Sequence, residues 1–293
     1  MCQVYRGRVR HSRRRRVQHS LVVIVVTLAL AAAPRVGRAQ RPIDRTRDRG
    51  PGIPTSLFGT YVDRGEFLVY PFFEYYRDRN YEYKPQELGY VIDQDFRGKY
   101  RANEGLLFLG YGISDRLALE FEAAVIEARL DKSPTDPSQL PTPLKESGLG
   151  DVAAQLRWRW NRETDTRPEW FSYFETTFPF QRNKLLIGTQ DWEFKFGTGI
   201  VRGMSWGTMT FRVAAEYAEN QIGPGEYAVE YLKRVSPNLR LYTGVEGVED
   251  EIEWISEAQL FLRRNVFLKL NSAFGLTSKA PDWAPEVGIM FVF

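Results

Sequence analysis

The chain ends with the stretch Trp283-Ala284-Pro285-Glu286-Val287-Gly288-Ile289-Met290-Phe291-Val292-Phe293. Every second residue from Val287 to Phe293, together with Trp283, is large and apolar, whereas the residues between them are small residues, a carboxylate and a thioether. A period of two is typical of a β-strand with two different faces. About ten alternating residues with aromatic side chains near both ends are what a membrane-spanning strand requires. The stretch therefore predicts the last strand of a transmembrane β-barrel.

The first 39 residues differ from the rest of the chain. A region rich in arginine precedes the apolar run from Leu21 to Ala33, and Gly37-Arg38-Ala39 follows with small residues. This layout is typical of a secretory signal peptide, here residues 1–39, cleaved after Ala39. The alternative is an uncleaved inner-membrane anchor, but the apolar run is short for a spanning helix.

Removal of this leader changes the charge and the chemistry of the chain. The leader holds nine of the 40 Lys and Arg residues and none of the 37 Asp and Glu residues, so residues 40–293 carry a formal charge of −6. An acidic chain of this kind does not predict nucleic-acid binding. Cys2, His11 and His19 also lie in the leader, so residues 40–293 contain neither Cys nor His.

Without histidine or cysteine, Ser-His-Asp and Cys-His catalysis and the usual zinc sites are excluded. Paired carboxylates remain, such as Glu120 with Glu122 and Asp191 with Glu193. Each pair has the i, i+2 spacing that one face of any strand produces, so it does not indicate glycoside hydrolysis. We therefore expect no enzyme and no cofactor, and only calcium sites made of carboxylates in outer loops stay open.

The rest of the chain divides into a lead-in and a run of strands. Residues 40–65, with prolines among alternating Arg and Asp, predict a flexible periplasmic lead-in. Residues 66–293 predict an all-β antiparallel barrel of about 12 strands, the even number typical of bacterial barrels. Period-two patterns place these strands at 66–78, 101–112, 116–129, 149–160, 170–179, 190–201, 207–218, 226–235, 239–248, 252–262, 265–275 and 283–293.

The connections support the same architecture. Alternate links are brief, as at Gly112–Asp115 and Ser236–Asn238. The two longest links, 79–100 and 130–148, both fall on the opposite side. Short periplasmic turns and longer outer loops are the asymmetry of transmembrane barrels.

Two short motifs resemble a known family. Gly112-Ile113-Ser114-Asp115-Arg116-Leu117 resembles its periplasmic turn, and Glu146-Ser147-Gly148-Leu149-Gly150-Asp151-Val152 resembles a glycine-rich segment that leads into a strand rich in arginine and tryptophan. Both are features of outer-membrane proteins grouped with the meta-pathway phenol-degradation family. The resemblance implies a Gram-negative outer-membrane barrel that transports small aromatic or hydrophobic compounds.

The polar face of each strand is expected to line the lumen, where acidic residues outnumber basic ones and favour a weak cation preference. An equally open interpretation is that these charges pair with one another and stabilise the barrel. The residues expected to line the lumen are Glu120, Glu122, Asp151, Gln155, Arg157, Arg159, Asp191, Glu193, Lys195, Arg212, Glu216, Glu230, Arg240, Glu246, Glu253, Glu257, Lys269 and Glu286.

The pattern as a whole predicts a passive outer-membrane channel for small molecules in a Gram-negative bacterium. The alternatives are a structural or surface-binding barrel with a plugged lumen and a soluble periplasmic β-protein. The partners expected are outer-membrane lipid and the barrel-assembly machinery. By resemblance to other outer-membrane proteins, Phe291 and the C-terminal Phe293 are expected to be the assembly signal.

Overall fold

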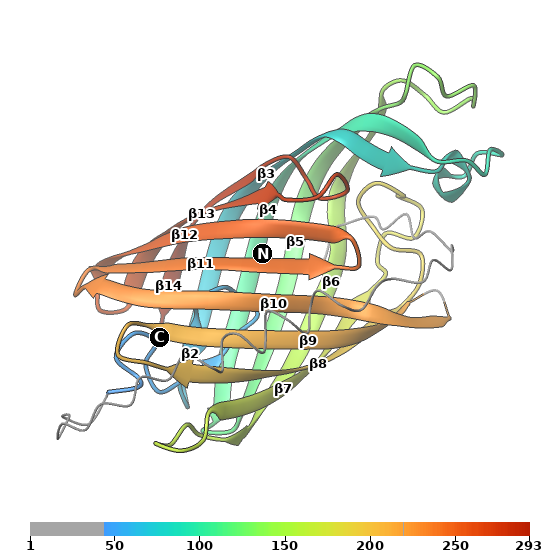
Figure 1. Ribbon diagram of the computed structural model, residues 1–293. Helices are drawn as coiled ribbons and strands as arrows, with labels where there is room; N and C mark the ends of the chain where they lie inside the picture. The colour runs from blue at the N-terminus through green and yellow to red at the C-terminus, as the bar shows by residue number, and fades with distance from the viewer. Residues whose placement is uncertain (1–43, 219) are drawn as a thin grey trace.

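The computed structural model describes residues 44–218 and 220–293, so the predicted signal peptide lies outside the described residues. Within this part of the chain, twelve antiparallel strands form one closed barrel (Figure 1). The strands are β3 (Phe67–Tyr83), β4 (Phe96–Ser114), β5 (Leu117–Asp131), β6 (Leu144–Asn161), β7 (Glu169–Phe178), β8 (Glu193–Gly203), β9 (Thr208–Ala218), β10 (Gln221–Ser236), β11 (Leu239–Val248), β12 (Glu251–Arg263), β13 (Val266–Gly275) and β14 (Ala284–Val292).

Each strand is joined to the next along the chain, and β14 closes the barrel against β3. At this seam Glu286 lies opposite Glu74, and the backbones of Phe67 and Phe293 exchange two hydrogen bonds of 3.0 and 2.9 Å. The prediction of a twelve-stranded antiparallel barrel is therefore confirmed. None of the described residues forms a helix long and apolar enough to cross a membrane.

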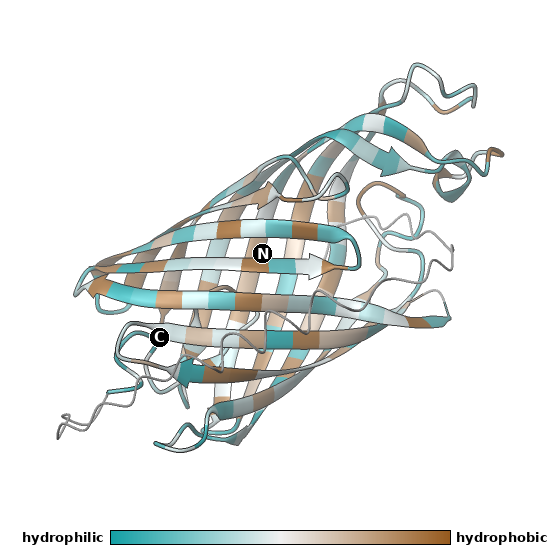
Figure 2. Cartoon of the chain, viewed as in Figure 1, coloured by the Kyte–Doolittle hydropathy of each residue, from teal (hydrophilic) through white to brown (hydrophobic). Residues whose placement is uncertain are grey.

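Alternation along the strands produces two different surfaces. In β5, Glu120 and Glu122 are buried in the interior, whereas Leu119 and Phe121 between them are 47% and 43% exposed on the outside. Figure 2 shows hydrophobic and hydrophilic residues in alternating bands along the strands. Large apolar side chains face outward and charged ones face inward, which is the arrangement of a barrel that sits in lipid.

The strands of such a barrel are tilted relative to its axis. A row of outward residues that are paired across neighbouring strands therefore runs obliquely to that axis. The row begins at Trp170 at the start of β7, and strand by strand it reaches Ile200, Phe211, Val229, Val245, Trp254 and Phe274. Neighbouring strands lie about 4.8 Å apart and tilt about 40°, so each step along a row moves about 3 Å along the barrel axis. The row crosses the apolar surface diagonally, from Trp170 at the end where β3 begins to Trp254 and Phe274 at the opposite end. We call these the periplasmic and the outer end, following the orientation that the sequence predicts.

Strands β3 to β6 run farther outward than the sequence pattern predicts. The predicted strands in this region end at residue 78 and begin at residues 101 and 149, whereas β3 continues to Tyr83 and β4 and β6 start at Phe96 and Leu144. These extensions carry polar residues on their outer face, and hydropathy alternation therefore fades there although the backbone pairing continues. In Figure 1 the β3–β4 pair extends well beyond the neighbouring strands at the outer end of the barrel.

The links follow the expected asymmetry. The turn between β4 and β5 is Asp115-Arg116 and that between β10 and β11 is Pro237-Asn238, both at the periplasmic end. The longest outer links are 84–95, which contains the short 3-10 helix η2 (Pro85–Leu88), 132–143 and 179–192. The last of these was not among the long loops that the sequence predicts.

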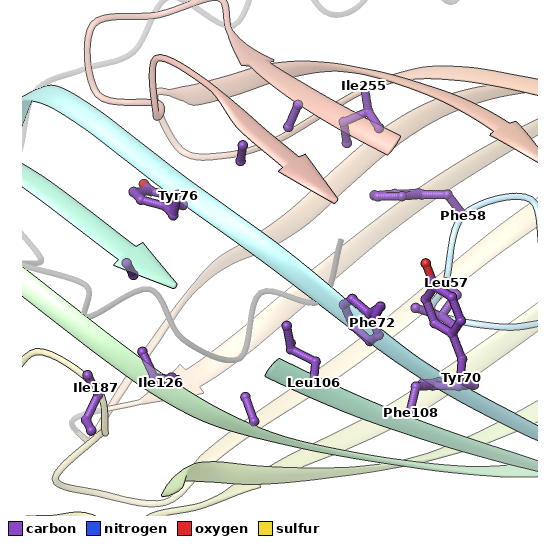
Figure 3. Packing of buried hydrophobic residues seen from close by; sticks show 14 of the residues in the cluster. Leu57, Phe58, Tyr70, Phe72, Tyr76, Leu106, Phe108, Ile126, Ile187 and Ile255 are labelled. Atoms are coloured by element: carbon purple, nitrogen blue, oxygen red, sulfur yellow. The ribbon is translucent and has the colours of Figure 1, made fainter. Parts of the chain in front are cut away.

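The segment before the barrel differs from the flexible lead-in that the sequence predicts. Residues 44–62, here called the lumen segment, contain a two-stranded hairpin, β1 (Ile53–Pro54) and β2 (Tyr61–Val62). Ile53, Leu57 and Phe58 are buried at 1–3% exposure in the same cluster as Tyr70 and other wall residues. Figure 3 shows Leu57 and Phe58 near Tyr70, inside the ring of strands. The segment lies within the periplasmic end of the barrel and is held there by side chains of the wall.

Candidate functional site

The candidate site is the lumen, and the structure places most of the predicted lining residues on its wall. Glu193 and Glu230 are half-buried there, whereas Asp191 is exposed because β8 begins only at Glu193. Their part in a permeation path stays a prediction. The residues that are buried on inward positions are Glu120, Glu122, Asp151, Gln155, Arg157, Arg159, Lys195, Arg212, Glu216, Arg240, Glu246, Glu253, Glu257, Lys269 and Glu286.

Wall arginines of β6 hold the backbone of the lumen segment. Arg157 Nη1 donates to the Pro54 carbonyl at 2.9 Å, and Arg159 Nη2 donates to the Pro51 carbonyl at 2.9 Å. From β5, Glu120 accepts hydrogen bonds from the Ser56 N–H at 2.9 Å and hydroxyl at 2.6 Å. The lumen segment is thus held by charged groups that would otherwise require other partners in the interior.

The opposite wall contributes a second set of contacts. Lys269 Nζ on β13 donates to the Phe58 carbonyl at 3.2 Å, and the Phe58 ring stacks on Tyr242 with centroids 5.0 Å apart. Gly59 follows with a φ of +56°, and a Cβ there would lie 2.9 Å from Gln259 Nε2. Glycine is suited to this turn because it tolerates positive φ and allows the close approach. The segment therefore bridges the lumen from β5 and β6 to β11, β12 and β13.

The start of the lumen segment pairs with the periplasmic ends of the wall. Arg49 is buried and lies 3.1 Å from Glu169 and 3.2 Å from Glu163. Asp48 accepts a hydrogen bond of 2.9 Å from the backbone N–H of Arg234. These contacts join segments more than 100 residues apart in the sequence, and no local pattern predicts them.

Farther along the lumen, Arg212 on β9 is the centre of an ion-pair network. Its guanidinium lies 2.6 Å from Glu230, 2.8 Å from Glu226 and 3.5 Å from Glu246. Lys195 lies 2.8 Å from Glu175 and extends the network to β7 and β8. Several bidentate or shared contacts on one guanidinium fix its position and define the shape of this wall.

The wall around the closing seam is acidic. Glu286, Glu74 and Glu104 lie opposite one another on β14, β3 and β4. The Tyr70 hydroxyl donates to Glu286 at 2.6 Å. The pleat of three adjacent strands thus brings three carboxylates into one row on the lumen wall.

The outer mouth is lined by apolar side chains instead of charges. Tyr100, Ile126 and Leu130 on the wall are buried in one cluster with Leu186 and Ile187 of the link 179–192. Figure 3 shows Ile187 beside Ile126. Glu146 anchors this link by accepting hydrogen bonds from the Leu185 and Leu186 N–H groups at 3.2 and 2.7 Å, and Asp151 accepts one from Thr189. The link therefore folds inward over the mouth.

A second outer link, 132–143, is organised by Asp136. Burial opposes ionisation of this carboxyl, but hydrogen bonds from Ser138 and Tyr83 outweigh that effect and hold the pKa of Asp136 below its usual value. A lowered pKa stabilises the link above the unfolded pKa of about 3.9, and this stability is lost as the pH falls through the folded pKa.

We expect Asp136→Asn to increase amide hydrogen exchange of residues 132–143 at pH 7 about fivefold, because an N-cap-like or turn hydrogen bond contributes about 1 kcal/mol. Exchange measured by mass spectrometry from pH 7 to pH 3, corrected for the intrinsic rate, checks this. The native link should lose protection only below about pH 4. Equal protection of this link at pH 7 in the native protein and in the Asp136→Asn variant would contradict the assignment.

Several residues of the lumen wall were not predicted from the sequence. Glu104 and Glu226 lie near the starts of the predicted strands 101–112 and 226–235, and the predicted lining contains no tyrosine, although Tyr70 and Tyr173 are buried. The Tyr173 hydroxyl donates to Glu226 at 2.6 Å. The signal for Glu104 was its i, i+2 spacing from Ala102 and Leu106, which continues the inward face of β4.

The side chains of the site do not indicate a metal centre. Within residues 44–218 and 220–293, no group of three or more His, Cys, Asp or Glu side chains is arranged to hold a metal ion. The charged side chains of the lumen form the ion pairs and hydrogen bonds described above. Such a wall can select solutes by size and charge.

No family model matches the chain, and no curated protein matches it in sequence. Among solved structures, it is similar to an outer membrane channel from Pseudomonas putida F1, with a TM-score of 0.60 and 18% identity over 82% of this chain and 99% of that chain. It is also similar to the translocator domain of the autotransporter NalP from Neisseria meningitidis, with a TM-score of 0.45 and 10% identity over 78% of this chain and 88% of that chain.

At 18% identity the first likeness shows the fold alone. It supports the outer-membrane barrel architecture that the sequence resemblance implied. Membership of the phenol-degradation family and the aromatic substrates that it implied stay predictions.

Proposed function

We propose that this chain is an outer-membrane channel for the passive diffusion of small solutes. The observation that carries the proposal is the wall of the lumen, which is charged along most of its length. The interior of an eight-stranded barrel is filled by its own side chains, whereas a sixteen-stranded barrel leaves an open channel. A twelve-stranded barrel encloses an intermediate space. In this chain the lumen segment occupies part of that space and leaves charged groups along the interior.

The charges of the wall favour cations. The buried charged residues of the twelve strands comprise thirteen acidic and six basic side chains. The acidic ones are Glu74, Asp78, Glu104, Glu120, Glu122, Asp151, Glu169, Glu216, Glu226, Glu246, Glu253, Glu257 and Glu286, and the basic ones are Arg157, Arg159, Lys195, Arg212, Arg240 and Lys269. An acidic lumen attracts cations and repels anions at low ionic strength.

The test is the current through the purified chain in a planar lipid bilayer. We expect discrete openings of small conductance, and a reversal potential in a salt gradient that indicates a cation preference. Graded solutes in a liposome-swelling assay then give the size limit. A clear anion selectivity would contradict the charge argument, and the absence of any openings would contradict the channel.

A matched pair of substitutions tests the role of the acidic wall. Glu286→Gln removes a charge inside the lumen, and we expect the cation-to-anion permeability ratio to fall roughly twofold. Glu127→Gln removes the same charge from the outward face of β5, where Glu127 is exposed, and should leave the ratio unchanged. Equal ratios in both variants and the native chain would show that Glu286 does not face the ion path.

The second candidate function is a barrel with a plugged lumen that serves as a surface-binding protein. The observations that favour it are the anchored lumen segment and the inward fold of the link 179–192. In that case loops would carry the interaction, and the bilayer would show no current above background. The same recordings therefore separate the two functions.

A further inference from the structure

The outward face of strands β3 to β6 carries a row of basic residues near its outer end. Arg77 lies opposite Arg101, Arg101 opposite Arg129, and Arg129 opposite Lys145 in the hydrogen-bonded register of four consecutive strands. We call these four residues the basic row. The neighbours of Arg77, Arg101 and Arg129 along their strands are buried, and those of Lys145, which are Leu144 and Glu146, are half-buried. The four side chains therefore face away from the lumen.

The basic row continues the aromatic residues that mark the outer edge of the apolar surface. The backbones of Arg77 and Trp283 pair through two hydrogen bonds of 3.0 and 3.2 Å. Trp283 comes one residue before β14, beside Phe274 and Trp254 of the diagonal row described above. Seven steps separate Trp170 from Trp283, or about 22 Å along the axis, close to the apolar band of about 25 Å in such barrels.

This spacing places the basic row at the outer membrane surface. Trp170 and Trp283 occupy the two interfaces, where tryptophan is enriched. The tilt of the strands continues in the same direction, so Arg77 lies at the level of the outer headgroups and each later residue lies about 3 Å farther out. On the membrane side, the outward row next to the basic row is mostly polar, and the row beyond it is apolar. The first consists of Tyr75, Asn103, Glu127 and Ser147, and the second of Phe73, Gly105, Val125 and Leu149.

Four cations in adjacent register positions repel one another, because directly opposite residues have Cβ atoms only about 5 Å apart. Asp131 compensates in part, since it lies 2.7 Å from Arg129 and 3.5 Å from Arg101. The only other outward carboxylate beside the row among the described residues of β3 to β6 is Glu127. Within residues 44–218 and 220–293, Arg77 and Lys145 form no ion pair with a described side chain within 4 Å. Asp282 interacts electrostatically with Arg77, but it pairs with Arg79 at 2.8 Å. The row therefore keeps an excess of positive charge.

We propose that the basic row binds the phosphate groups of lipopolysaccharide in the outer leaflet, an inference that rests on the outer-membrane placement in the proposed function. Guanidinium groups bind phosphate through paired charge-assisted hydrogen bonds, and clustered cations at a membrane surface bind anionic headgroups. A row of cations that rises from the interface suits a headgroup with phosphates at more than one depth. The apolar residues on its membrane side contact the acyl chains of the same lipid.

The test uses the full mature chain, folded in detergent micelles, with fluorescently labelled lipopolysaccharide as the probe. The variant R77Q/R101Q/R129Q/K145Q removes the basic row, and we expect its affinity to be at least tenfold weaker. The control R64Q/R116Q/R263Q/R264Q removes four exposed cations at the periplasmic turns and should bind as the native chain does. Dephosphorylated lipopolysaccharide should bind the native chain as weakly as intact lipopolysaccharide binds the first variant.

Heat-modifiable mobility on gels shows whether each variant is folded. If the fourfold variant does not fold, R77Q/K145Q, which removes no ion pair with a described side chain, should still weaken binding about threefold or more. An affinity within twofold of the native chain, an equal loss in the periplasmic control, or equal binding of dephosphorylated lipid would overturn the proposal. Displacement by millimolar inorganic phosphate would show a site for free phosphate instead. Conductance is measured in a separate experiment. If the channel proposal fails, the lipopolysaccharide-binding result can still be interpreted.

Discussion

Replacing residues 44–62 with a glycine–serine linker of the same length is expected to raise the single-channel conductance on the order of fivefold, since a twelve-stranded barrel encloses more space than its wall fills. The linker lacks the Phe58 ring that stacks on Tyr242 and the Ser56 hydroxyl that donates to Glu120. It also lacks the turn that brings Gly59 close to Gln259. Without these contacts the linker remains mobile and the path widens. The measurement is the amplitude of single openings in a planar bilayer.

A second variant controls for the linker itself. The same glycine–serine sequence inserted before Asp44 keeps the lumen segment and should keep the native conductance. If the replacement variant also keeps the native conductance, the lumen segment does not restrict the path. If neither variant nor the native chain conducts, the channel proposal is contradicted and the plugged barrel is favoured.

The largest effect on stability is expected from Arg157→Met. Arg157 is fully buried, lies 3.0 Å from Glu120, donates to Pro54, and stacks over Tyr173 at 4.8 Å. Removing one partner of a buried ion pair leaves the other uncompensated and costs about 3–5 kcal/mol in the free energy of unfolding. Urea unfolding of the protein in lipid vesicles, followed by tryptophan fluorescence, measures this loss.

Two further variants separate the ion pair from packing. The double variant Arg157→Met with Glu120→Leu removes both charges, and most of the stability should return because apolar replacement of a buried pair is often neutral. Arg162→Gln removes an exposed arginine that lies 3.1 Å from Asp115, and it should cost at most about 1 kcal/mol. If the double variant is as unstable as Arg157→Met, the arginine acts through its stacking and its hydrogen bond to Pro54.

The barrel could be predicted from the sequence because its strands repeat one local rule. In β5 the alternation of Leu119 and Phe121 with Glu120 and Glu122 is visible without any knowledge of partners. A lipid-facing strand must follow this rule over its whole span, so the pattern recurs twelve times. Above the membrane the rule no longer applies, and the extensions of β3 to β6 could not be read in the same way.

The position of the lumen segment could not be predicted because the side-chain contacts that hold it to the wall are distant in sequence. Arg49 and Asp48 lie among prolines and charges of the kind that usually remain solvated, yet their partners Glu169 and Arg234 lie on strands far along the chain. Asp191 is the opposite case. The alternation of polar and apolar residues includes Asp191, but β8 begins only at Glu193, so Asp191 lies outside the strand. The apolar run Leu185-Leu186-Ile187 was a signal in the sequence that the link 179–192 folds inward, because such a run is rarely left in solvent.

The position of the lumen segment also constrains how the barrel is assembled. The segment directly precedes β3, the first strand, whereas Gln259 and Lys269, which hold Phe58, belong to β12 and β13 near the end of the chain. These contacts can therefore form only after β12 and β13 are in place in the wall. The first and last strands of the barrel, β3 and β14, lie on opposite sides of the closing seam. Docking of the lumen segment is therefore completed late in assembly, after strands from the far end of the chain have entered the wall.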